Sequence, residues 1–165
     1  MSQEKHREID RLQMIGLLHN AEDGSTIPIM VTGMSMTPFL FHKQSIAFLK
    51  KDSQYQPKVG DIVFFVREDM APVLHRIVKI KKDGILVIKG DAQRWREEIH
   101  PGQILAHVTH IIRTEEKFSV ESKAYRFWVK VWKPFRLIHP PLAFVINVCH
   151  RLPYKLSRKS WKGDF

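Results

Sequence analysis

Cysteine is nearly absent from this chain of 165 residues, and the one present, Cys149, cannot form an internal disulfide. The N-terminus lacks a basic start followed by an apolar run, so we expect neither a signal peptide nor an N-terminal membrane anchor. The apolar run within residues 142–150 is too short to cross a bilayer as a helix. A hydrophobic content of 44% is ordinary for a globular domain and supplies enough apolar residues for a core.

Metal-binding patterns are missing as well. His75, His100, His107 and His110 do not have the spacing of a tetrahedral Cys/His site, although His107 and His110 are close in the sequence. We therefore expect no metal ion and no other cofactor.

Acidic residues are scarce in only one part of the chain. Residues 123–165 hold ten Lys or Arg and one acid, a net charge of +9. Residues 1–122 hold seventeen basic and sixteen acidic residues, a net charge of +1. Nearly all of the +10 total therefore lies in the C-terminal segment.

Residues 31–38, VTGMSMTP, place a serine just after a predicted strand. The run 27–31 predicts the strand, and Gly33 and Pro38 prevent the segment from continuing as regular structure. A hydroxyl on a tight turn after a strand is well placed to face a cleft, as a nucleophilic serine requires. The alternative is that Ser35 only hydrogen-bonds its own turn, as loop serines commonly do.

His75, in the apolar segment 73–78, is a candidate general base. A neutral imidazole can take the proton of a serine near pH 7, and an ionisable ring in an apolar strand is costly without a partner. The next predicted strand, 85–89, leads to Asp91, whose carboxylate is placed to orient the imidazole and stabilise its protonated form. The alternatives are a structural histidine and an ordinary Gly-Asp turn.

Four segments together resemble a known superfamily. They are Gly-x-Ser-Met-x-Pro at 33–38, Lys-Val-Gly-Asp-Ile-Val at 58–63, His-Arg-Ile at 75–77 and Lys-Gly-Asp at 89–91. Their order resembles type I signal peptidases and LexA-like serine peptidases over about residues 27–113. The His-Arg-Ile segment is similar to the archaeal and endoplasmic-reticulum branch, which has histidine where bacterial signal peptidases have a lysine base. The resemblance implies Ser35 as nucleophile, His75 as general base and Asp91 as support.

The sequence departs from that branch at two places. One residue separates Gly33 from Ser35, as in LexA-like repressors. Thr32 is therefore not assigned as a side-chain donor to the oxyanion. The backbone N–H of Ser35 is the expected donor. The second aspartate of the branch is missing after Asp91, and Glu97 is its possible substitute. A self-cleaving repressor is a poor fit, because residues 1–26 are too few for a helix-turn-helix and no Ala-Gly or Cys-Gly bond precedes Ser35.

The strand pattern predicts a mainly β fold, a coiled antiparallel sheet or partly open barrel, and the resemblance implies that it is of the LexA–signal peptidase type. Residues 1–26 predict a short N-terminal helix, residues 27–113 the β domain, and residues 114–165 a basic, aromatic-rich tail that is helical. Strands are expected at 27–31, 45–49, 61–66, 73–81, 85–89 and 104–112.

The basic tail suits three roles. A cationic amphipathic helix with tryptophans fits an anionic membrane surface, where each basic residue adds roughly 1 kcal/mol of attraction. Basic residues between aromatics also fit single-stranded nucleic acid, which we favour less. In the third role the aromatics pack on the β domain and the charges face solvent. The candidate membrane contacts are Trp128, Lys130, Trp132, Lys133 and Arg136.

These patterns favour a serine endopeptidase that uses a Ser35–His75 dyad. The resemblance implies that its substrate is a leader or signal peptide. The missing N-terminal anchor and the basic tail favour a cytoplasmic enzyme or one bound peripherally at the inner membrane face. The alternative is a non-catalytic β-domain adaptor whose tail docks on membrane or nucleic acid.

Overall fold

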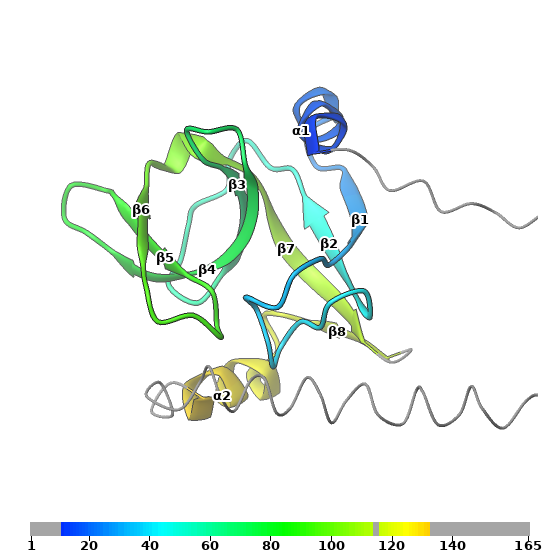
Figure 1. Ribbon diagram of the computed structural model, residues 1–165, viewed down its shortest axis with the longest axis vertical. Coiled ribbons are helices and arrows are strands. Elements are labelled where there is room, and N and C mark those ends of the chain that lie inside the picture. The colour runs from blue at the N-terminus through cyan, green and yellow to red at the C-terminus, as the bar shows by residue number, and fades with distance from the viewer. Residues whose placement is uncertain (1–10, 114–115, 133–165) are drawn as a thin grey trace, which may run out of the picture.

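The computed structural model describes residues 11–113 and 116–132, which form a mainly β structure with a helix at each end. A ten-residue helix, α1 (Arg11–Asn20), precedes the strands, and α2 (Lys123–Trp132) follows them (Figure 1). The strands are β1 (Thr26–Met30), β2 (Ser45–Lys50), β3 (Ile62–Val66), β4 (Pro72–Ile80), β5 (Leu86–Lys89), β6 (Glu97–Ile99), β7 (Ile104–Arg113) and β8 (Glu116–Ser119). A single 3-10 turn, η1 (Pro101–Gln103), leads into β7.

All eight strands belong to one antiparallel sheet. Their order is β1-β2-β7-β3-β4-β5-β6, with β8 paired to β7. Strands β1 and β6 are its two ends and do not pair with each other, so the sheet is open. Figure 1 shows β3, β4, β5 and β6 curling around one side of the molecule while β1, β2 and β7 extend along the other.

Strand β3 is buried on both of its faces. Successive side chains of a strand point to opposite faces, yet Ile62, Val63, Phe64 and Phe65 are all buried. Ile62 and Phe64 belong to the larger apolar cluster beside β1, β2 and β7, whereas Val63 and Phe65 belong to a second cluster with residues of β4, β5 and β6. The coiled sheet therefore covers β3 from both sides.

Helix α1 is held against the sheet by one apolar anchor and one cap. Leu18 is fully buried in the larger cluster. The Nζ atom of Lys51 donates hydrogen bonds to the carbonyl oxygens of His19 (2.6 Å) and Ala21 (2.9 Å). Carbonyls at a helix C-terminus have no partner within the helix, so this lysine satisfies groups that would otherwise need water.

The predicted strands are all present, with ends within one residue of the predicted ones, and two further strands were not predicted. Strand β6 reads Glu-Glu-Ile and β8 reads Glu-Lys-Phe-Ser, so neither has the apolar alternation that marks a strand in a sequence. They form because β5 and β7 offer them backbone partners. The sheet consequently extends beyond residue 113, where the sequence pattern ended the β domain.

Helix α2 confirms a helix in the basic tail and divides its aromatic residues between two environments. Tyr125 and Val129, one turn apart, are buried against the sheet, while Phe127 and Trp128 are each 61% exposed. Lys133, Arg136, Cys149 and the apolar run 142–150 lie outside the described residues, as does the side chain of Trp132. Within residues 11–113 and 116–132, no helix has the length and apolar character needed to cross a membrane.

Candidate active site

Three of the four sequence segments meet at Arg76, a fully buried arginine of β4. Its Nη1 donates to the carbonyl of Gly60 (2.8 Å), while Nε and Nη2 donate to the two carboxylate oxygens of Asp91 (2.9 and 2.7 Å). Nη2 also donates to the hydroxyl of Tyr125 in α2 (2.8 Å). A buried guanidinium is costly unless its donors are satisfied, and here backbone, carboxylate and phenol satisfy them together.

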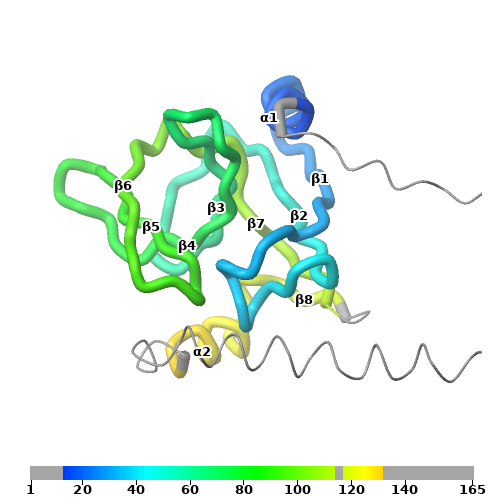
Figure 2. The backbone as a smooth tube through the Cα atoms, in the orientation of Figure 1, coloured from blue at the N-terminus to red at the C-terminus, as the bar shows by residue number. Residues whose placement is uncertain are grey.

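The serine lies in the connection between β1 and β2, which Figure 2 shows folding back on itself before β2 begins. Gly33 has a φ of +89°, a conformation that side chains disfavour, and its N–H donates to Nδ1 of His42 (2.9 Å). Met36 and Leu40, further along the connection, are fully buried and fix it to the larger apolar cluster. Ser35 is thus presented by a loop that is held at both ends.

Gly90 brings the Lys-Gly-Asp turn against the serine loop. The N–H of Ala92 donates to the carbonyl oxygen of Ser35 (2.8 Å). A Cβ atom on residue 90 would lie 2.7 Å from that oxygen and 2.6 Å from Oε1 of Gln93, closer than a real Cβ contact allows. The glycine is therefore required by the close approach of the two loops.

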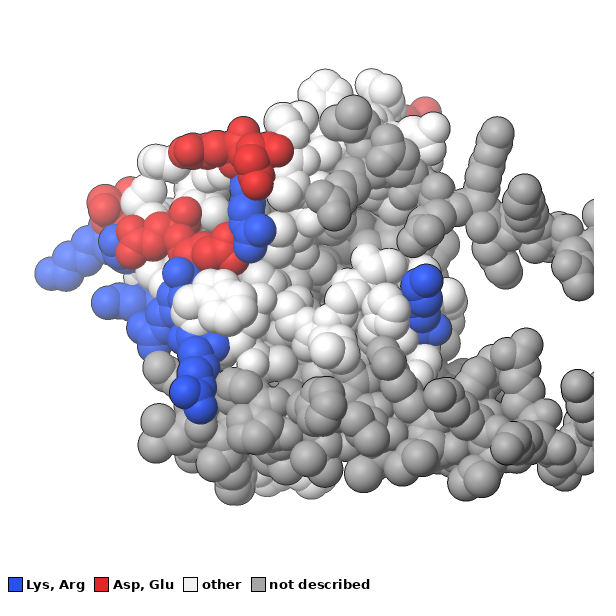
Figure 3. All heavy atoms as spheres, in the orientation of Figure 1, with Lys and Arg blue, Asp and Glu red and all other residues white. Residues whose placement is uncertain are grey.

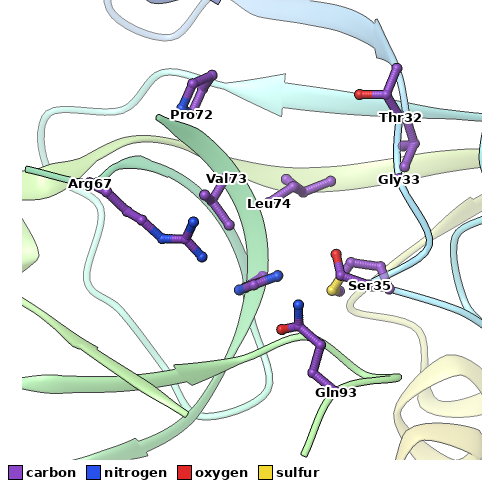
Figure 4. Close-up of a pocket in the computed structure, with 11 residues that line it drawn as sticks. Thr32, Gly33, Ser35, Arg67, Pro72, Val73, Leu74 and Gln93 are labelled. Atoms are coloured by element: carbon purple, nitrogen blue, oxygen red, sulfur yellow. The ribbon is translucent and has the colours of Figure 1, made fainter. Parts of the chain in front are cut away.

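A cavity of about 250 Å³ opens where these elements meet. Ser35 and His75 both line it, so the structure brings together the two residues that the sequence predicted as nucleophile and base. Figure 4 shows Ser35 and Gln93 entering it from two loops and Arg67 pointing into it from the end of β3. The other lining residues are Val31, Thr32, Gly33, Met36, Pro72, Val73 and Leu74.

His75 is buried in β4, and its ring faces a carboxylate. Nδ1 lies 3.4 Å from Oε1 of Glu97 but makes no aligned hydrogen bond with any described residue. Burial lowers the pKa of His75 to about 4, with the nearby Glu97 opposing the shift. The imidazole is therefore neutral at pH 7, and the contact of Nδ1 with Glu97 leaves Nε2 as the nitrogen that can accept a proton.

Glu97, in β6, is fixed by an arginine on its other side. Nη2 of Arg67 donates to Oε1 (2.6 Å) and Nε donates to Oε2, a bidentate arrangement that holds the plane of the carboxylate. Glu97 in turn raises the pKa of Arg67. Glu97 therefore contacts both Arg67 and His75, and these two residues line the cavity.

The carboxylate beside the imidazole is thus Glu97, and the carboxylate of Asp91 is bound by Arg76. This differs from the expectation that Asp91 would orient His75. Consecutive residues of a strand point to opposite faces, so His75 and Arg76 have different partners, and the turn after β5 delivers Asp91 to the arginine. Glu97, proposed from the sequence as possible support, occupies the position next to the base.

Two residues of the cavity were not anticipated, Arg67 and Gln93. Arg67 ends the β3 segment, thirty positions from Glu97, and nothing in the sequence links the two. Gln93 follows Gly90 in a turn, and its role depends on the direction in which that turn folds. In the sequence, the only feature that could have pointed to Gln93 is its position shortly after the Lys-Gly-Asp segment.

Two groups of Ser35 matter for a reaction at this site, the side-chain hydroxyl and the backbone N–H. Within residues 11–113 and 116–132, neither its hydroxyl nor its backbone N–H makes a hydrogen bond, and the hydroxyl is not bonded to His75. Catalytic hydrogen bonds are often long in the absence of substrate and tighten only when it binds. The site thus combines a half-buried serine, a neutral imidazole and an arginine-bound carboxylate.

Metal ligands are not grouped in the described part of the chain: no three His, Cys, Asp or Glu side chains lie close enough together to hold an ion. His107 instead stacks on Tyr55, with ring centroids 4.2 Å apart. No protein-family model matches the chain, and no curated protein matches its sequence.

Proposed function

We propose that this protein is a serine endopeptidase of the signal-peptidase-like type, built on a coiled sheet of the LexA–signal peptidase kind. One observation carries the proposal: Ser35 and His75, which come from different elements, line the same cavity, and the imidazole is neutral at pH 7. The ordered sequence segments support it, because each one contributes to the network around that cavity.

The mechanism follows from the protonation states. Nε2 of His75 takes the proton of the Ser35 hydroxyl as Oγ attacks a peptide carbonyl carbon, and the carbonyl oxygen becomes an oxyanion. The backbone N–H of Ser35 donates to that oxyanion. His75 then gives its proton to the leaving amine, and a water hydrolyses the acyl-enzyme by the same route. Glu97 stabilises the imidazolium formed in both steps.

The proposed substrate is a leader or signal peptide that enters as an extended chain. Val31, Val73 and Leu74 give the cavity an apolar wall that suits an uncharged side chain beside the scissile bond. We propose that the enzyme acts from the cytoplasm or peripherally at the inner face of the membrane.

A peripheral position is supported by the exposed side of α2. Phe127 and Trp128 face solvent, and Arg126 and Lys130 are exposed on the same helix. Figure 3 shows basic and acidic side chains together on the side of the molecule that carries the β5–β6 connection, so that side is mixed in charge, and the support comes from α2. Exposed aromatics among basic residues are typical of surfaces that enter an anionic lipid interface.

Vesicle sedimentation tests the membrane contact. The variant F127S/W128S should lose binding to vesicles rich in phosphatidylglycerol, whereas V59S/M70S, which removes two exposed apolar residues elsewhere, should not. Equal binding by all three proteins would contradict the contact without bearing on catalysis.

Labelling by a fluorophosphonate, read by intact mass, tests the peptidase proposal. Wild type should gain the mass of one phosphonyl group, and Ser35→Ala and His75→Ala should not, although both should keep the thermal unfolding of a folded domain. Absence of labelling in folded wild-type protein would contradict the proposal.

A non-catalytic adaptor is the second candidate. The observation that favours it is the missing hydrogen bond between the hydroxyl of Ser35 and His75. An adaptor with a vestigial pair would show no labelling, whereas F127S/W128S would still lose binding to its partner surface.

A further inference from the structure

Oxyanion holes commonly combine backbone N–H groups with side-chain donors, and the cavity that Ser35 lines also contains a side-chain amide. We propose that the side-chain amide of Gln93 is a donor of this kind, so that Nε2 of Gln93 and the backbone N–H of Ser35 hold the oxyanion together. The inference rests on the proposed peptidase function and names a catalytic residue that the sequence motifs do not include.

The orientation of the amide is fixed by its other end. The backbone N–H of Gly90 donates to the Gln93 side chain (3.2 Å), and an N–H can only be met by the carbonyl oxygen, Oε1. The NH₂ group is therefore turned away from the turn. Within residues 11–113 and 116–132 it donates to no other group, so its protons remain for a ligand.

The close contacts around Gly90 show where the side-chain amide of Gln93 lies. A Cβ at residue 90 would be in close contact with both Oε1 of Gln93 and the carbonyl oxygen of Ser35, so these two groups converge on the same point. The bond from the N–H of Ala92 to that carbonyl ties the two loops together. Figure 4 shows the side chain of Gln93 extending, with its amide end toward β4, into the cavity that Ser35 also lines.

The other hydrogen-bond donors near Ser35 are less suited to hold the oxyanion. The N–H of Gly33 already donates to His42 (2.9 Å), and two nitrogens of Arg67 are bound to Glu97. Thr32 lines the cavity and carries a hydroxyl, so it is the competing donor. Gln93 differs from Thr32 because the hydrogen bond from the N–H of Gly90 holds its amide in place before substrate arrives.

The rate of phosphonylation measures this donor directly, because the phosphoryl oxygen gains negative charge as Ser35 attacks phosphorus and fluoride leaves. Gln93→Glu keeps an acceptor for Gly90 and removes the donor, and Gln93→Ala removes the whole amide. We expect the maximal labelling rate to fall about 100-fold in both variants, as for the loss of one oxyanion donor, with the probe concentration at half-maximal rate unchanged. The matched control, Gln56→Glu, makes the same change at an exposed glutamine and should label like wild type.

The outcomes separate the inference from the proposed function. Wild-type labelling with normal rates in both Gln93 variants would overturn the inference and leave the peptidase intact. A loss of rate in Thr32→Val but in neither Gln93 variant would assign the donor to Thr32 instead. If Gln93→Glu fails to fold, Gln93→Ala decides alone. No labelling of wild type would overturn both proposals.

Discussion

Strand β4 carries two neighbouring basic residues, each paired with a carboxylate, and the two pairs are built differently. Arg76 is fully buried, and all of its bonds are to the protein itself: Asp91, Gly60 and Tyr125. His75 is equally buried, but its Nδ1 makes only a 3.4 Å contact with Glu97, and its ring lines a cavity.

This difference between the two pairs indicates a structural role for one and a chemical role for the other. All three guanidinium nitrogens of Arg76 donate hydrogen bonds within the protein, so we assign Arg76 the structural role of fixing the loops that it joins. The ring of His75 lines a cavity, and its Nε2 makes no hydrogen bond within residues 11–113 and 116–132, so this nitrogen can still exchange a proton. We infer that the Arg76–Asp91 pair holds the site together, and the proposed function assigns the chemistry to the His75–Glu97 pair.

Removing Arg76 should have the largest effect. Arg76→Met removes the two hydrogen bonds to the buried carboxylate of Asp91 and the hydrogen bond to Tyr125 of α2, so we expect the free energy of unfolding to fall by about 3–5 kcal/mol. Urea denaturation measures this. Lys79→Met, an exposed position on the same strand, is the control and should change stability little. A stable Arg76→Met protein would contradict the structural role.

Gly90→Ala should disturb the contact between the two loops. The new Cβ would press on the carbonyl of Ser35, which is backbone and cannot turn aside, so we expect a loss of about 1–3 kcal/mol of stability and slower fluorophosphonate labelling. Gly102→Ala, where nothing lies within 4 Å of the added carbon, should leave both quantities unchanged. Equal behaviour of the two variants would show that the loops are not packed as described.

Glu97→Gln should affect the reaction more than the fold. Removing the charge beside His75 withdraws its stabilisation of the imidazolium, and we expect labelling to slow by about 10- to 100-fold, the range of a positioned acid–base contribution. The neighbouring Glu98→Gln, which alters only an exposed pair with Lys81, provides the comparison. Similar rates in the two variants would contradict the role of Glu97.

The pH dependence should reflect the lowered pKa of His75. Labelling needs a neutral base, so its rate should stay constant as pH falls toward 5 and halve at about pH 4. The unfolded chain protonates this histidine first, near its ordinary pKa of 6.5, so stability should fall as pH drops from about 6.5 to 4, by at most about 1.4 kcal/mol per pH unit. A rate that halves near pH 6.5 would indicate an exposed ring.

The sequence predicted the strands that have strong apolar patterns, and it singled out Ser35 and His75, which line the same cavity. Turn residues and ordered motifs carry that information locally. It could not assign the carboxylates, because Asp91 and Glu97 both follow β5 and only the three-dimensional path of the turn decides which one meets the ring. Arg67 was missed because its partner Glu97, thirty residues along the chain, is brought close by the coiling of the sheet. Gln93 was missed because it reaches the cavity only through the packing of its turn against the loop that carries Ser35.

The most direct test of the account compares Asp91→Asn with Glu97→Gln, measuring labelling rate and unfolding free energy on the same samples. The account predicts that Asp91→Asn loses stability and that its folded fraction still labels, whereas Glu97→Gln stays folded and labels slowly. The opposite pattern, a stable Asp91→Asn that does not label beside a Glu97→Gln that labels like wild type, would contradict it.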